Sequence, residues 1–337
     1  MRTIVRPADL DLQTPGRRDY YVALEHDSIW GDHLIPLTVL VGEAVQSGRG
    51  LVAFGSTHGN EYEGPVGLKH LCRELTEADA LGRVILVPVL NVAAFRAGSR
   101  DSVWDDRVNL NRAFVEGAGR PGLAGITHRI AAFVREAIWP FVHVVIDLHA
   151  GGLVGQFAPC VSYHPIEDPT QGALIEETAR LFGTELLLTY QNETPGLLSS
   201  EAERLGKVTL GAELGYGCSV SPAGVRYAMQ GVRAAAIRHG QLRGTVQAPG
   251  RAARVVSIVD RSCVTIAPFA GHFEPLFGCG DAVREGQLLG WLHDFDRIDL
   301  PPEPLYAGRT GVLVCQAWSA PVLQGQHVAV VGSERDA

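Results

Sequence analysis

The sequence predicts an α/β fold with helices on both faces of a sheet, followed by an all-β C-terminal region. Short apolar runs alternate with helical segments between residues 51 and 240. Helical patterns then stop after about residue 244, where glycine and proline break up short apolar stretches. The chain has 337 residues, more than one small core usually organises. We therefore expect two domains, or one large domain with an appendage.

The predicted strands follow from apolar and β-branched runs. In the first fifty residues, DYYVALEH (19–26) and HLIPLTVLVG (33–42) predict a β segment, residues 1–50, that joins the catalytic domain. Four further runs have the continuous apolar character of strands buried on both faces. They are LVAFG (51–55), VILVPVL (84–90), VHVVIDL (142–148) and VTLGAEL (208–214).

Three helices are predicted from apolar spacing and from their end signals. One begins at Gly64-Pro65, where proline suits the first turn of a helix. A second covers residues 126–138, where isoleucine or valine recurs every four residues. The third covers residues 222–239, between a Ser-Pro start and Gly240. Residues 51–244 are thus the predicted α/β domain, and residues 245–337 the predicted all-β domain.

Composition excludes several classes of function. The net charge is −8, the only lysines are Lys69 and Lys207, and the arginines form no block, so the sequence has no electrostatic signature of nucleic-acid binding. The longest uncharged run, residues 310–333, contains amides and a proline and is a poor membrane span. The N-terminus has no apolar signal segment, so we expect a cytoplasmic protein. Six scattered cysteines favour free thiols over disulfides or a thiolate zinc site.

The stretch GSTHGNEYEGP (55–65) is the first candidate site. His58 and Glu61 are three residues apart, so on a helical turn both side chains face one point and can supply two ligands to a divalent metal. The spacing alone is a weak signal, because most such pairs lie on a solvated helix face.

The second candidate lies in VHVVIDLHAGG. His149 ends an apolar strand, which is where open α/β sheets collect their ligands. Asp147 is two residues earlier, on the same face of a regular strand, and can orient a metal ligand. The alternative is an ordinary hydrogen-bonded histidine at a strand end.

Two further stretches carry candidate polar groups. Asn111 and Arg112 in VNLNRAF can hold a substrate carboxylate, although a surface ion pair beside a turn is the common alternative. Glu213 in VTLGAELGYG follows an apolar run among small residues. It is either an ion-pair partner or a carboxylate whose pKa is raised for acid–base work.

These four stretches, taken in order, resemble the zinc carboxypeptidase superfamily, and within it the succinylglutamate desuccinylase/aspartoacylase family. THGNEYEGPVGL, and NVAAFRAGSR ahead of NLNRAF, are most similar to the N-acetyl-diaminobutyrate deacetylase branch. The resemblance implies a mixed sheet flanked by helices. It implies one Zn²⁺ on His58, Glu61 and His149, with a fourth position for water. It also implies that Glu213 is the general base that activates the water and then protonates the leaving amine.

The same resemblance assigns substrate contacts. Asn111 and Arg112 would hold the substrate carboxylate. An upstream arginine would polarise the scissile carbonyl: Arg100 is our prediction and Arg107 the alternative. ELGYGCSV replaces a more glycine-rich run, so Tyr216 is predicted near the site, either contacting substrate or packing.

The C-terminal region resembles a biotinyl/lipoyl-like β-barrel. It contains no lysine, so it cannot carry biotin or lipoate. We expect a structural cap that narrows the site or supports oligomers. The family resemblance implies that such a domain restricts access to small substrates, which favours a deacylase over a peptidase.

The sequence therefore predicts a zinc-dependent amidohydrolase that removes acetyl or a similar short acyl group from an N-acylated amino acid or diamino acid. Two alternatives stay open: a carboxypeptidase acting on small peptides or amides, and a non-catalytic binding protein that keeps the fold. The expected partner is a small N-acyl amino acid, not a nucleic acid or a membrane. A homo-oligomer, and a divalent ion other than zinc, are left open.

Overall fold

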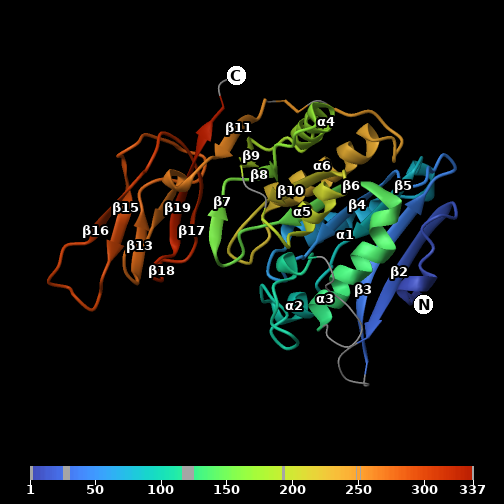
Figure 1. Ribbon diagram of the computed structural model, residues 1–337, viewed down its shortest axis with the longest axis horizontal. Coiled ribbons are helices and arrows are strands. Elements are labelled where there is room, and N and C mark those ends of the chain that lie inside the picture. Colours follow the sequence, from blue (N-terminus) through green and yellow to red (C-terminus); the bar gives the residue numbers. More distant parts are fainter. Residues whose placement is uncertain are drawn as a thin grey trace.

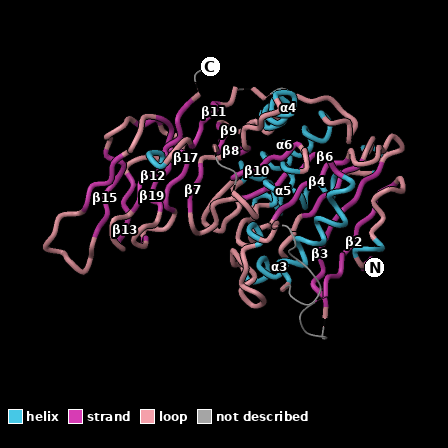
Figure 2. The backbone as a smooth tube through the Cα atoms, in the orientation of Figure 1, coloured by secondary structure: helices cyan, strands magenta, loops and turns pink. Residues whose placement is uncertain are grey.

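The computed structural model describes residues 3–25, 31–115, 125–191, 194–247, 249–250 and 252–335. A large mixed sheet with helices on both faces forms the N-terminal part, and a smaller β region follows it (Figures 1 and 2). The predicted α/β class and the β character of the C-terminal region are both confirmed; the helical element among the described residues of that region is one 3₁₀ turn, η6 (Arg261–Cys263).

The large sheet begins at the N-terminus and has the order β1-β2-β3-β5-β4-β6-β10-β8-β9 over its first part. β4 pairs in parallel with β5 and β6, and β6 pairs in parallel with β10. β2, β3 and β8 make the antiparallel pairs of this mixed sheet. Its strands are β1 (Thr3–Val5), β2 (Gly16–Glu25), β3 (Asp32–Val41), β4 (Gly50–Gly55), β5 (Arg83–Val87), β6 (Val142–His149), β8 (Cys160–Tyr163), β9 (Leu186–Tyr190) and β10 (Val208–Glu213). The predicted strands correspond to β2 to β6 and β10, with His26 outside the described residues.

Helices cover both faces of the central strands because neighbouring residues of each strand face opposite cores. On β4, Val52 and Phe54 belong to one core, and Leu51 and Ala53 to the other. α3 and α5 pack in the first core, and α1, α4 and α6 in the second. The helices are α1 (Glu63–Glu74), α2 (Val92–Ala97), α3 (Ile126–Phe133), α4 (Pro169–Arg180), α5 (Leu198–Arg204) and α6 (Pro222–Arg238).

The end signals of the predicted helices are seen in the structure. The Ser221 hydroxyl accepts a hydrogen bond from the Gly224 amide at 3.0 Å and caps α6. Gly240 follows the helix with a φ of 69°. The segment predicted as one helix over 126–138 changes character at Val134: α3 ends at Phe133, and Val134–Ile138 form a π-helical turn.

The C-terminal β region is joined to the large sheet by strand pairing. β11 pairs in parallel with β9 and antiparallel with β19, and β7 (Gly155–Phe157) pairs with β17 (Figure 1). A second sheet has the order β16-β15-β13-β18. The strands are β11 (Arg254–Ile258), β12 (Val264–Ile266), β13 (Gly271–Pro275), β14 (Ala282–Val283), β15 (Leu288–His293), β16 (Glu303–Tyr306), β17 (Gly311–Ala317), β18 (Pro321–Val322) and β19 (His327–Glu334).

The six cysteines are free thiols, as predicted. Within the described ranges, no helix combines the length and the apolar character needed to cross a membrane.

Candidate active site

Three neighbouring parallel strands bring the predicted site residues to one edge of the sheet. β4, β6 and β10 run in the same direction, so their carboxyl ends meet at this edge. His149 and Glu213 are the last residues of β6 and β10 and lie opposite each other in the register. His58 follows the end of β4 by three residues. The edge therefore collects side chains that are far apart in sequence.

The segment between β4 and α1 is a compact turn and not the helical turn that the spacing suggested. Ser56 has a φ of 55°, which turns the chain sharply after the strand. A side chain at Gly59 would lie 2.0 Å from a backbone carbon of Ala94, so only glycine allows this close approach to α2. His58 and Glu61 both precede α1, which begins at Glu63. The turn, and not a helix, therefore brings the His58 and Glu61 side chains together.

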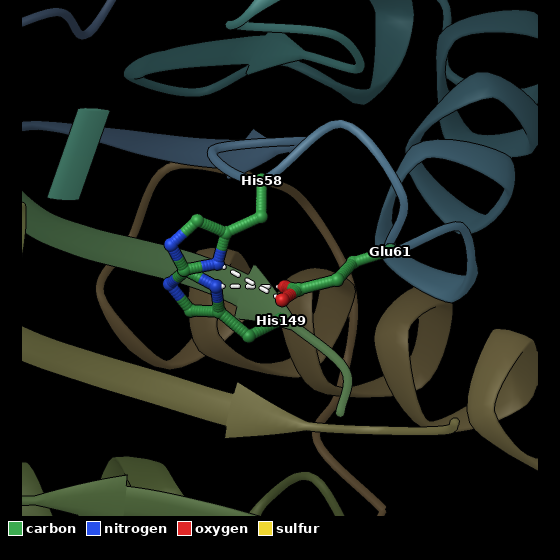
Figure 3. Close-up of side chains that lie close together, drawn as sticks. All are labelled: His58, Glu61 and His149. Atoms are coloured by element: carbon green, nitrogen blue, oxygen red, sulfur yellow. Dashed lines mark hydrogen bonds and ion pairs between the residues drawn. The ribbon is translucent and has the colours of Figure 1, made fainter. Parts of the chain in front are cut away.

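His58, Glu61 and His149 form one cluster (Figure 3). Nδ1 of His58 lies 2.9 Å from Oε1 of Glu61, and Nδ1 of His149 lies 2.9 Å from Oε2 of Glu61. One ligand atom from each residue lies within 4.8 Å of the others. Two imidazole nitrogens and a carboxylate, with room for a fourth ligand, are a donor set typical of catalytic zinc. The side chains therefore fit one divalent cation.

The electrostatics of the cluster also favour a cation. Burial acts to raise the pKa of Glu61, but the charges and hydrogen bonds of His58 and His149 outweigh it and hold that pKa well below its ordinary value. Burial acts to lower the pKa of His149, but Asp147 and Glu61 raise it well above its ordinary value. The carboxylates thus draw positive charge into a buried position that a metal ion can fill.

Polar groups outside the cluster fix both imidazole rings. Oδ2 of Asp147 lies 2.7 Å from Nε2 of His149, and Asp147 also accepts a hydrogen bond of 2.6 Å from Thr57. Oδ1 of Asn109 lies 3.2 Å from Nε2 of His58. Such partners orient imidazole ligands and select their tautomer. Asp147 has the position predicted for it, whereas sequence reasoning did not single out Asn109.

Glu213 presents a carboxylate beside the cluster. Burial, followed by the negative charge of Glu61, raises the pKa of Glu213 to about 8. Its Oε2 atom is buried and has no hydrogen-bond partner among the described residues. A buried polar atom without a partner is rare and calls for an explanation such as a catalytic role. This carboxylate has the environment of a group that exchanges protons.

Of the two candidate arginines, Arg100 lies at the cluster. Its Nη1 atom is 3.1 Å from Oε1 of Glu61, and its side chain lines both cavities that meet there. Arg107 is exposed and appears in the lining of neither cavity. The geometry favours Arg100 for the predicted contact with a scissile carbonyl.

The first cavity, of about 280 Å³, has a lining that is more polar than that of the second, and Asn111 and Arg112 line it together with the cluster histidines. Asn111 and Arg112 lie in a short 3₁₀ turn, η3 (Leu110–Arg112). Oδ1 of Asn111 accepts a hydrogen bond of 2.8 Å from the Leu198 amide, and its Nδ2 lies 3.4 Å from Nε2 of His149. Asn111 therefore connects the cluster of His58, Glu61 and His149 to α5.

The second cavity, of about 470 Å³, lies between the cluster and the C-terminal strands. β17 and β19 contribute Val314 and Val328, and Glu61 and Glu213 lie at its opposite side. The C-terminal region thus forms one wall of a cavity next to the site.

Of the two roles predicted for Tyr216, the structure favours packing over substrate contact. Tyr216 packs against Trp318, with ring centroids 4.6 Å apart, and lines neither cavity. His164 lines the first cavity beside Glu203 and Tyr190, and sequence reasoning singled out none of the three.

Comparisons with known proteins agree with this geometry. Residues 47–238 match the succinylglutamate desuccinylase/aspartoacylase catalytic domain. The chain is 31% identical over 330 residues to N-alpha-acetyl-L-2,4-diaminobutyric acid deacetylase of Halomonas elongata, covering 96% of this chain and 94% of that protein. The product-bound ectoine utilization protein EutE (DoeB) from Ruegeria pomeroyi is 33% identical, with a TM-score of 0.89 over 96% of this chain and 98% of that one. A succinylglutamate desuccinylase/aspartoacylase from Rhodobacter sphaeroides is 29% identical, with a TM-score of 0.89 and 98% of both chains covered.

Proposed function

Because the chain belongs to the succinylglutamate desuccinylase/aspartoacylase family, we propose that it is a zinc-dependent deacylase that hydrolyses the amide bond of a small N-acyl amino acid. The observation that carries this proposal is the convergence of His58, Glu61 and His149 within 4.8 Å beside Glu213 and Arg100. The relative that deacetylates an N-acetyl diamino acid makes an N-acetylated diamino acid the first substrate to test.

Under this proposal, three side chains hold the ion and two act on the substrate. Zinc bound by His58, Glu61 and His149 would supply Lewis acidity, which acidifies water and polarises an amide carbonyl. Glu213 accepts a proton from the attacking water and delivers it to the leaving nitrogen as the C–N bond breaks. Arg100 donates hydrogen bonds to the carbonyl oxygen while negative charge develops on it.

The two cavities give the substrate an orientation. Arg112 offers a fixed positive charge in the first cavity, so the amino-acid part of the substrate lies there with its carboxylate on the guanidinium. The acyl part faces Glu213 and the strands β17 and β19. Zinc as the ion and a cytoplasmic location belong to this proposal.

The proposal is tested by metal analysis together with a panel of N-acetyl, N-succinyl and N-formyl amino acids and small peptides. We expect about one zinc per chain and chelator-sensitive hydrolysis of one acyl class, as a three-ligand catalytic site requires. Hydrolysis of C-terminal peptide bonds instead would make the protein a carboxypeptidase. Ligand binding without turnover by metal-replete protein would make it a binding protein. Absence of metal after reconstitution would overturn the proposed site.

Replacement of Arg112 by alanine tests the carboxylate contact. We expect KM for carboxylated substrates to rise by about 10- to 100-fold, because a hydrogen bond to a charged group contributes roughly 1.5–3 kcal/mol. For substrate amides, in which the carboxylate is blocked, KM should rise much less. Steady-state kinetics on acid and amide forms provide the comparison, and an unchanged KM for the acid form would exclude the contact.

A further inference from the structure

The first cavity contains a carboxylate that the proposed reaction does not use. Glu203 on α5 lines this cavity together with Arg112, and only 10% of its side chain is exposed. Its Oε2 atom accepts a hydrogen bond of 2.9 Å from Nδ1 of His164. We propose that Glu203 binds the side-chain ammonium group of a diamino acid while Arg112 binds its carboxylate, so that this pair selects the leaving amino acid. The inference rests on the proposed function.

The carboxylates that line this cavity differ in their hydrogen-bond partners. Within the described part of the chain they are Asp147, Glu203 and Glu213. Asp147 is engaged with His149 and Thr57, and Glu213 lies beside the metal cluster. Among the described residues, the hydrogen bonds of Glu203 are with His164 and not with the cluster or its partners. Glu203 is therefore the carboxylate of this lining whose remaining lone pairs can accept hydrogen bonds from a substrate cation.

His164 holds the Glu203 carboxylate in place, because its Nδ1 atom lies 3.1 Å from Oε1 and 2.9 Å from Oε2 of Glu203. When the imidazole is neutral and donates its Nδ1 proton, the carboxylate keeps its negative charge. Tyr163, which lines the same wall, directs its hydroxyl to Glu176 at 3.0 Å and so does not compete for Glu203. In a largely desolvated position, opposite charges attract more strongly than they do in water. The Glu203 carboxylate therefore attracts a cationic substrate side chain and repels an anionic one.

Hydrogen bonds hold α5, which carries Glu203, in place next to η3, which carries Arg112. The Leu198 amide at the start of α5 donates to Asn111, the residue directly before Arg112. On another side of α5, Glu201 accepts hydrogen bonds from Trp139 at 2.9 Å and from Arg135 at 2.8 Å. α5 is thus attached both to η3 and to the segment after α3. This attachment assigns Glu201 a structural role and leaves Glu203 directed to the cavity.

The predicted consequence is selectivity by charge on the leaving amino acid. N-acetyl-2,4-diaminobutyrate carries an ammonium group that N-acetyl-2-aminobutyrate lacks, and N-acetylaspartate carries a carboxylate instead. We expect kcat/KM to fall in that order in the wild type. Glu203→Gln keeps the size and removes the charge. It should lower kcat/KM for the diamino substrate by about 10- to 100-fold, the range of a charge-assisted hydrogen bond. The loss should appear mainly as a higher KM, with the neutral substrate nearly unchanged.

Three measurements separate recognition from structure. Calorimetric binding of free 2,4-diaminobutyrate and 2-aminobutyrate reports the contact without turnover, and Glu203→Gln should remove the preference for the former. Glu203→Asp, which restores the charge, should recover part of it. Glu177→Gln removes an exposed carboxylate that pairs with Arg238 on the surface, and should leave both substrates unaffected.

The outcomes distinguish this inference from the proposed function. A wild type that turns over the neutral and the cationic substrates equally well overturns the inference and leaves the deacylase standing. An equal loss on both substrates in Glu203→Gln assigns the residue a structural role and also overturns it. Failure of the wild type on every N-acyl amino acid overturns the proposed function itself.

Discussion

Glu213→Gln is expected to lower kcat by about 10²- to 10⁴-fold, the range contributed by a positioned acid–base group, while the protein keeps its metal. The amide has nearly the shape of the carboxylate but cannot take a proton from water. The carboxyl environment supports this role, because burial and the charge of Glu61 raise the pKa of Glu213 to about 8 and its Oε2 atom has no partner among the described residues. Steady-state kinetics and metal analysis of the wild type and of Glu213→Gln give the comparison.

The control is a carboxylate whose loss should leave the reaction intact. Glu177→Gln removes the exposed partner of Arg238 and should keep wild-type kcat and metal content. Full activity in Glu213→Gln would remove this residue from the mechanism. Loss of the metal in the same variant would mean that Glu213 supports the ion and would contradict its assignment as a proton carrier.

Much of the site was predictable because it lies where buried parallel strands end. Continuous apolar runs identify β4, β6 and β10, and each is followed or closed by a residue of the site: His58, His149 and Glu213. Parallel neighbours bring such residues to one edge whatever their distance in sequence. Asp147 could be placed in the same way, because residues two apart on a strand share a face.

The wall of the first cavity could not be predicted, because it depends on long-range contacts. Glu203 reaches the cavity through α5, a helix of seven residues with little apolar pattern of its own. α5 is positioned by a hydrogen bond between Leu198 and Asn111, which are 87 residues apart. His164 follows β8, a strand of four residues that sequence patterns did not separate from its surroundings. Nothing local in these segments indicates which side chains meet.

The contact between the C-terminal region and the site could not be predicted from the sequence either. Its β character was evident from glycine and proline spacing, but its contact with the site is set by strand pairing. β11 and β19 extend the large sheet, and β7 pairs with β17. These pairings place Val314 and Val328 in the second cavity. Tyr216 lies against Trp318 of the C-terminal region rather than in either cavity, a contact between residues about a hundred positions apart. The boundary at residues 244 and 245 remains a prediction.

Arg100→Gln is expected to lower kcat by about 10²- to 10³-fold, the loss typical of removing one preorganised donor to a developing oxyanion. The guanidinium reaches both cavities at the point where they meet, and its Nη1 atom lies 3.1 Å from Glu61. Because the charge on the carbonyl oxygen is small in the bound substrate and large in the transition state, kcat should fall more than KM rises. Arg100→Gln should also bind a transition-state analogue with a phosphonamidate or phosphonate group more weakly than the wild type does, in parallel with its loss of kcat/KM.

Arg107→Gln is the matched control, since it removes the same charge seven residues along the chain from a side chain that is exposed and outside both cavities. It should keep wild-type kcat. Metal analysis of Arg100→Gln is essential, because the arginine also touches Glu61, and a lost ion would imitate a lost donor. A metal-replete Arg100→Gln protein with wild-type kcat would assign the arginine to orienting Glu61. A large loss in Arg107→Gln alone would transfer the carbonyl contact to that residue and would require the segment between α2 and η3 to rearrange when substrate binds.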